Sequence, residues 1–148
     1  MSNMSEYTLS DTMTRLFDKK NGIGISMLRN TIGASDFSLE YSTYNDIEYG
    51  STDYNLEKFD MSSAAKQMAL TKKAMELNSD IKLFLSPWSA PLWMKKYNTW
   101  GSNLYNILQN TLKTDCYDVY ARYLTKAVEE NNEVTKTSLD YAQEGIKA

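Results

Sequence analysis

Two short apolar runs constrain the fold of this chain most strongly. Residues 22–29 (GIGISMLR) and 81–85 (IKLFL) are apolar and bounded by turn residues, which is typical of buried strands. Between them lie an irregular stretch at residues 30–60 and a helical pattern at residues 61–78. Strands joined through a helix pair in parallel, because a crossover connection is needed to bring the chain back. The sequence therefore predicts a βαβ unit in an α/β fold.

Helices are predicted before and between these strands. Residues 11–17 form the first, with Ser10 as N-cap and with Met13, Leu16 and Phe17 on one face. Residues 61–78 form the second, capped by Ser62 or Asp60. Its apolar face is expected to carry Ala64, Ala65, Met68 and Met75.

The strongest amphipathic pattern comes late in the chain. Its helix is capped by Thr114 or Asp115. The expected apolar face is formed by Tyr117, Tyr120, Ala121, Leu124, Ala127 and Val128. A polar segment at residues 129–138 follows, then a weak helical signal with Gly145 as C-cap, and residues 146–148 lead toward a further strand.

Composition narrows the possible functions. The chain has 148 residues, enough for one domain, and its net charge of -3 with scattered lysines argues against a nucleic-acid partner. No run reaches the roughly 18 apolar residues of a membrane span, and residues 1–10 lack signal-peptide character. With no histidine and only Cys116, we expect no His-dependent triad, no metal, no cofactor and no internal disulfide. Carboxylate chemistry remains, and eleven tyrosines and three tryptophans suit stacking on sugar rings.

Two loops carry the candidate functional residues, and each follows a strand and precedes a helix. The first begins RNTIGASDF, which places Arg29 at a strand end and Asp36 on the following loop. The second begins SPWSAPLWMK, where Pro87 and Pro91 stiffen the backbone around two tryptophans. From the pattern alone, the favoured interpretation is that Arg29 pairs with a nearby carboxylate at the strand end and that Asp36 is a turn residue. Trp88 and Trp93 can equally plug a core, and for Trp93 packing is the favoured role.

These strings resemble glycoside hydrolase family 30, the glucosylceramidase and β-1,6-glucanase group. The family carries a strand ending in LRN or LRV, then SDF or CDF, and later a strand ending in SPWSAPxWMK. Here these motifs are residues 28–30, 35–37 and 86–95. Further agreement is found at Tyr44, Asp46, Leu56, Phe59, Tyr120, Ala121 and Tyr123.

The resemblance implies part of a (β/α) TIM barrel, with about two to three β/α units, from a retaining β-glycosidase. It implies that Asp36 and Trp88 bind the sugar, and that Arg29 and Trp93 support the active site. The substrate would be a β-glucoside or glycolipid, with no obligate protein partner. Within the family the substrate could be glucosylceramide, a β-1,6-glucan or a xylan, and the GASDF string and the tyrosine-rich loop favour the glucosylceramidase-like branch. The family is usually secreted or lysosomal, but the sequence does not indicate a compartment.

Neither catalytic glutamate is expected in residues 1–148. The family's acid/base lies in an Asn-Glu-Pro string after the next barrel strand, whereas Asn132-Glu133 precedes Val134 and follows no strand. We therefore interpret the chain as a partial catalytic domain that lacks the first strand, the appended β-domain and the later half of the barrel, and that is inactive alone. The alternatives are a non-catalytic sugar-binding remnant and an unrelated soluble α/β interaction module.

Overall fold

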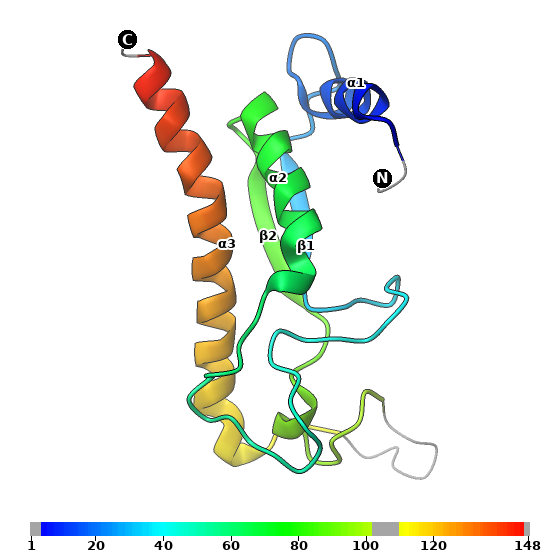
Figure 1. The fold of residues 1–148 in the computed structure, drawn as a ribbon, viewed down its shortest axis with the longest axis vertical. Helices are drawn as coiled ribbons and strands as arrows, with labels where there is room; N and C mark the ends of the chain where they lie inside the picture. The colour runs from blue at the N-terminus through cyan, green and yellow to red at the C-terminus, as the bar shows by residue number, and fades with distance from the viewer. Residues whose placement is uncertain (1–3, 102–109, 147–148) are drawn as a thin grey trace. The chain divides into compact units, whose positions relative to one another are not determined.

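The computed structural model describes residues 4–101 and 110–146, with the backbone alone for residues 134–146. The main elements in chain order are α1 (Glu6–Phe17), β1 (Met27–Ile32), α2 (Ala65–Leu77), β2 (Lys82–Pro87) and α3 (Tyr117–Ile146) (Figure 1). Short 3-10 turns occur at η1 (Ser62–Ala64), η2 (Leu92–Met94) and η3 (Thr114–Cys116). Strands β1 and β2 pair in parallel, with α2 between them in the chain. The predicted βαβ unit is therefore confirmed.

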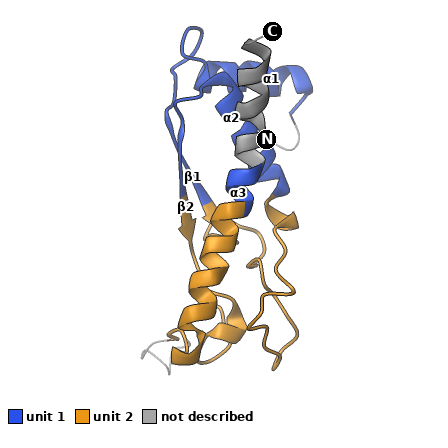
Figure 2. Ribbon diagram, turned by 90° about the vertical axis from the view of Figure 1, so that its left-hand side faces the viewer, with its two compact units in different colours: residues 1–30, 65–84, 130–148 blue, residues 31–64, 85–129 orange. Residues whose placement is uncertain are grey.

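The chain divides into two compact units (Figure 2). The first comprises Met1–Asn30, Ala65–Phe84 and Glu130–Ala148, and the second comprises Thr31–Ala64 and Leu85–Glu129. The division passes through β1, β2 and α3. As a result, the carboxyl ends of both strands belong to the second unit together with the loops that follow them.

The core of the first unit lies where α1 packs against α2. Its fully buried apolar residues are Met13, Phe17, Ala74 and Ile81. Removing these side chains from water is the main force holding the two helices together. Gly22 permits the tight turn after α1, because a Cβ there would lie 2.3 Å from the carbonyl oxygen of Thr14.

Helix α1 is longer than predicted. It begins at Glu6, and Ser5 is its N-cap, with Ser5 Oγ accepting a hydrogen bond from the Thr8 backbone N–H at 3.2 Å. The predicted cap, Ser10, lies inside the helix, so that prediction was wrong. Serine is a favoured N-cap residue at either position. The helix begins after Ser5 because the Ser5 side chain accepts a hydrogen bond from a first-turn N–H that would otherwise be unpaired.

The apolar face predicted for residues 61–78 is confirmed in part, since Ala64 is buried and Met75 packs against the core of the first unit. Ala65 is exposed, whereas the polar Thr71 is buried beside Ala74. Thr71 tolerates burial because its hydroxyl donates to the Gln67 carbonyl at 2.9 Å and accepts from Asn30 Nδ2 at 2.8 Å. A pattern based on apolarity alone misses such a satisfied polar residue.

The observed starts of β1 and α2 also differ from the predicted ones. Strand β1 starts at Met27, and residues 22–26 instead form a connection in which the Ile23 N–H donates to the Arg15 carbonyl at 2.9 Å. Before η1, which leads into α2, Asp60 Oδ1 accepts a hydrogen bond from the Ser62 N–H at 2.7 Å.

Helix α3 continues through the polar segment that was expected to separate two helical signals. It runs from Tyr117 to Ile146, so residues 129–138 are helical and Gly145 lies within the helix. No glycine or proline interrupts residues 117–144, so no strong helix breaker ends the helix in this stretch. Residues 147–148, predicted to lead into a strand, lie outside the described residues.

The buried face of α3 is rotated from the predicted one. Val119, Tyr123 and Ala127 are buried, whereas Tyr117 and Ala121 are exposed. None of the helices in the described ranges is both long enough and apolar enough for a membrane span.

Candidate functional site

Aromatic side chains fill the interior of the second unit. Tyr123 of α3 contacts Phe59 with ring centroids 5.5 Å apart, and its hydroxyl oxygen accepts from the Tyr44 backbone N–H at 3.1 Å. Burial raises the pKa of both Tyr123 and Tyr44, so these phenols stay neutral at physiological pH. These contacts hold the loop after β1 onto the first half of α3.

A buried polar network holds this loop onto the segment after β2. Trp93 Nε1 donates to Asn45 Oδ1 at 2.7 Å, and Asn45 Nδ2 donates to Asp53 Oδ2 at 2.9 Å. The Asp53 carboxylate also accepts from the backbone N–H groups of Glu57 at 3.0 Å and Lys58 at 2.8 Å. Burial acts to raise the pKa of Asp53, but these hydrogen bonds outweigh it and leave that pKa below its usual value.

Trp93 is therefore buried, in line with the favoured packing role. Asn45 and Asp53 were not singled out from the sequence, because neither lies in a distinctive string. Their structural role comes from the hydrogen bonds that they form once the chain has folded.

A cavity of about 660 Å³, here called the main cavity, lies in the second unit. The loop after β1 lines it with Ala34, Ser35 and Tyr41. The loop after β2 contributes Trp88, Ser89, Ala90 and Lys95. The wall is completed by Trp100, Gly101, Asn110 and Leu112. The cavity thus lies where the loops after two neighbouring parallel strands meet, the end of a (β/α) barrel where active sites form.

Three aromatic side chains line the main cavity. Trp88 is 45% exposed, so its indole is accessible to a ligand. Tyr41 and Trp100 stack on each other, with ring centroids 5.6 Å apart and an interplanar angle of 27°. Accessible aromatic faces can cover the apolar C–H face of a sugar ring.

Lys95 is a buried cation in the wall of this cavity. Its Nζ donates to Ser89 Oγ at 2.9 Å and to the Trp100 carbonyl at 3.2 Å, and it lies 5.7 Å from the Trp100 ring centroid. Burial lowers the pKa of Lys95. These contacts connect the segment that carries Trp88 to the segment that carries Trp100. No role for Lys95 was predicted, although it ends the SPWSAPLWMK string.

Asp36 lies next to the main cavity in sequence but does not line it. Its side chain is exposed, whereas its neighbour Ser35 forms part of the wall. The loop is fixed locally, because the Ser35 N–H donates to Ser38 Oγ at 2.9 Å and the Ser38 N–H donates to the Ser35 carbonyl at 3.1 Å. Gly33 has φ +78°, and a Cβ there would lie 2.7 Å from the Ser42 carbonyl oxygen. The loop therefore requires glycine at this point.

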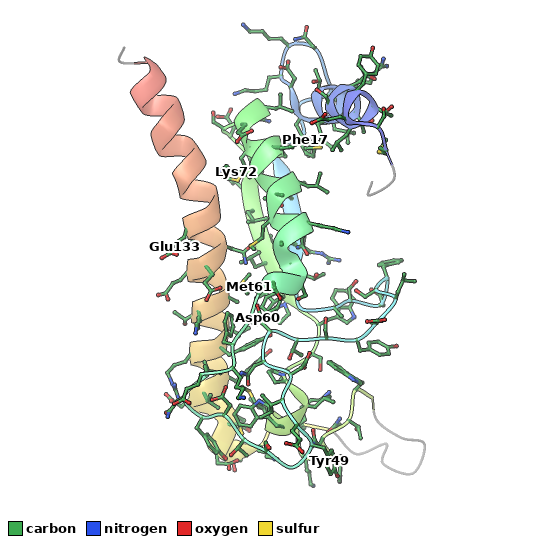
Figure 3. The ribbon with its side chains drawn as sticks, in the orientation of Figure 1. Phe17, Tyr49, Asp60, Met61, Lys72 and Glu133 are labelled. Carbon is green, nitrogen blue, oxygen red and sulfur yellow. The ribbon has the colours of Figure 1, made fainter. Side chains whose placement is uncertain are left out.

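Arg29 and the Asn132-Glu133 pair belong to the first unit. Arg29 lies on β1 with an exposed side chain that is engaged in an interaction, and its supporting role stays a prediction. Glu133 lies within α3 (Figure 3), so Asn132-Glu133 follows a helical residue and not a strand end. In the part of the chain that the structure describes, no group of three or more histidine, cysteine or carboxylate side chains could hold a metal ion.

The amino-acid sequence matches a known family over most of its length. Residues 2–142 match the glycosyl hydrolase family 30 TIM-barrel domain. The chain belongs to this family. The resemblance and the barrel fold predicted from the two strings are confirmed, and the alternative of an unrelated interaction module is wrong.

Relatives within family 30 carry two kinds of name. "Putative glucosylceramidase 2" of Caenorhabditis elegans is 31% identical over 124 residues, which cover 82% of this chain and 23% of that protein. "Endo-1,6-beta-D-glucanase BGN16.3" of Trichoderma harzianum is 36% identical over 104 residues, which cover 70% of this chain and 21% of that protein. The chain thus spans between a fifth and a quarter of the length of these relatives.

Two solved structures share the fold. SrfJ from Salmonella typhimurium has a TM-score of 0.78 and 27% identity, and the match covers 90% of this chain and 28% of that one. The endo-beta1,6-glucanase BT3312 has a TM-score of 0.70 and 28% identity, over 88% of this chain and 28% of that one.

Proposed function

We propose that this family 30 chain supplies a sugar-binding wall of a retaining β-glycosidase that acts on β-linked glucosides. The observation that carries the proposal is the main cavity, where the aromatic faces of Trp88, Tyr41 and Trp100 lie beside the hydroxyls of Ser35 and Ser89. A pyranose ring needs this combination, because its C–H face is apolar and its edge carries hydroxyls.

Each residue implied by the family resemblance has a role in this proposal. Trp88 stacks on the sugar, and the Asp36 carboxylate accepts hydrogen bonds from sugar hydroxyls. Trp93 holds the SPWSAPLWMK segment in place through its bond to Asn45. Arg29 favours the ionised form of the nucleophilic carboxylate. The names of the relatives support glucosylceramide and β-1,6-glucan as substrate classes.

The chemistry of retaining hydrolysis needs two carboxyl groups about 5–5.5 Å apart. One protonates the leaving oxygen while the other attacks the anomeric carbon, and water then releases the sugar with the first group acting as base. No aspartate or glutamate is among the described residues that line the main cavity. We therefore expect the 148-residue chain to bind a β-glucoside without cleaving it.

Calorimetric titration with methyl β-D-glucoside tests the binding proposal. Trp88→Ala and Asp36→Asn should each weaken binding by about tenfold, the effect of losing about 1.4 kcal/mol. The matched controls are Phe84→Ala, which removes another exposed aromatic ring, and Glu40→Gln, which neutralises another exposed carboxylate of the same loop. If the controls weaken binding as much as the test variants, the cavity is not the sugar site.

Hydrolysis of an aryl β-glucoside tests the expectation that the chain does not cleave the sugar that it binds. The purified chain should show no turnover above the uncatalysed rate while still binding methyl β-D-glucoside. Sustained release of the aryl group that is abolished by replacing a carboxylate side chain would contradict this expectation. It would show that a reactive pair of carboxyl groups is present in these residues. Binding without turnover is also the outcome that the alternative of a non-catalytic sugar-binding remnant predicts.

A further inference from the structure

Lys95 is a buried cation whose recorded partners are all uncharged. Its side chain is 7% exposed, and the ion pairs found among residues 4–101 and 110–133 join other side chains. The ammonium group donates instead to the Ser89 hydroxyl and to the Trp100 carbonyl. Taking a cation out of water without an opposite charge costs free energy. A lysine here therefore costs stability that an uncharged side chain of similar length would not.

The local fold does not depend on the ammonium group. The Lys95 backbone is held separately, because its N–H donates to the Leu92 carbonyl at 2.9 Å and it forms an antiparallel bridge with Leu112. The Ser89 hydroxyl has a bond of its own, to the Ala90 carbonyl at 3.0 Å. Since Ser89 lines the main cavity, water in the cavity can replace the ammonium group there.

The ammonium group does connect two separate parts of the main cavity wall. Its two hydrogen bonds join Ser89, the neighbour of Trp88 in the chain, to the backbone of Trp100. It also lies 5.7 Å from the centroid of the Trp100 ring, which is within the range of a cation–π contact. Trp100 in turn stacks on Tyr41. Both the backbone and the ring of Trp100 are thus held by one buried charge.

We propose that Lys95 is a positioning residue for ligand binding, whose ammonium group fixes Trp100 on Tyr41 and beside the Trp88 segment before a ligand arrives. This inference rests on the proposed function of the main cavity, and it requires no contact between Lys95 and the sugar. A ring that is fixed in advance loses less freedom on binding, which favours affinity. The ammonium group therefore lowers stability and raises affinity, a trade-off that is common at functional sites.

Replacing Lys95 with methionine separates these two effects. Methionine keeps an unbranched apolar side chain but has neither a charge nor an N–H donor. Calorimetric titration should show about threefold to tenfold weaker binding of methyl β-D-glucoside in Lys95→Met, because the ligand must then order the Trp100 ring. The midpoint of urea unfolding should be unchanged or higher. A residue needed only for packing would instead lower both the midpoint and the affinity.

Lys96→Met is the matched control, because it makes the same chemical change at the next residue. Lys96 is exposed, and its Nζ lies 5.3 Å from the centroid of the Tyr97 ring. The control should leave the affinity and the midpoint unchanged. The indole N–H signal of Trp100 in a proton–nitrogen correlation NMR spectrum, assigned by its loss in Trp100→Phe, reports the surroundings of the ring. It should move in Lys95→Met and stay in place in Lys96→Met.

Three results overturn the inference and leave the proposed function standing. These are an unchanged affinity in Lys95→Met, an unmoved Trp100 signal in that variant, and a midpoint that falls together with the affinity. Failure of the unaltered chain to bind methyl β-D-glucoside overturns the proposed function, and this inference with it.

Discussion

Replacing Asn45 with alanine should destabilise the second unit more than any exposed substitution nearby. Asn45 is 0% exposed and is the middle member of the Trp93–Asn45–Asp53 network. Alanine removes both the acceptor for the indole N–H and one donor to the carboxylate. Both groups stay buried, so water does not fully replace the lost partners.

The magnitude follows from what each group loses. The Trp93 indole N–H loses its acceptor inside the core, which costs about 1–3 kcal/mol. Asp53 keeps its bonds from Glu57 and Lys58, so the lost bond to its carboxylate costs less than a complete desolvation, about 1 kcal/mol. The free energy of unfolding should therefore fall by about 2–4 kcal/mol in Asn45→Ala.

Urea unfolding followed by far-ultraviolet circular dichroism measures this loss, with the free energy extrapolated linearly to zero urea. Asn55→Ala is the matched control, because Asn55 is exposed on the same loop and makes only a 3.4 Å contact with Glu57. The control should change the free energy of unfolding by less than about 0.5 kcal/mol. A loss below about 1 kcal/mol in Asn45→Ala would refute the claim that this network holds the two loops together.

Three further outcomes can be measured by the same unfolding assay. Ser5→Ala should lower the free energy of unfolding by about 1 kcal/mol by removing the N-cap of α1, whereas Ser10→Ala inside the helix should not lower it. Gly33→Ala should cost more than Gly50→Ala, because both have positive φ, worth about 1–2 kcal/mol, but only Gly33 also meets a backbone oxygen. The lowered pKa of Asp53 adds stability above its unfolded pKa of about 3.9 that is lost as pH falls through the folded value, so Asp53→Asn should flatten the fall in stability below about pH 4.

Local sequence signals predicted the positions of the helices and strands better than they predicted which faces of the helices are buried. The two apolar runs predicted β1, β2 and the crossover, because strand and helix periods are properties of neighbouring residues. On α2, the burial of Thr71 was missed because threonine is polar, and its burial depends on a hydrogen bond from Asn30 of β1, which is distant in sequence. The length of α3 was misjudged because residues 129–138 were interpreted as a polar segment between two helical signals, although no glycine or proline interrupts the chain there.

The candidate site was predictable in part for a similar reason. Trp88 stands out because the flanking prolines stiffen its segment, a signal within ten residues of sequence. Tyr41, Trp100 and Lys95 carry no comparable local signal. Their meeting depends on long-range contacts, namely the Tyr41–Trp100 stack and the antiparallel bridge between Lys95 and Leu112.

Exposure separates the aromatic residues of the second unit into two groups with different roles. Tyr44, Trp93 and Tyr123 are buried, and each has a hydrogen bond for its polar atom or backbone, so packing accounts for them. Trp88 and Tyr41 remain exposed although each could bury a large apolar area. An exposed ring lacks that stabilisation unless another molecule covers it. Single exposed aromatic rings scattered over a surface are common and need no functional explanation. Trp88 and Tyr41 both line the main cavity, with Trp100 stacked beside Tyr41, and this arrangement points to a ligand with a flat apolar face.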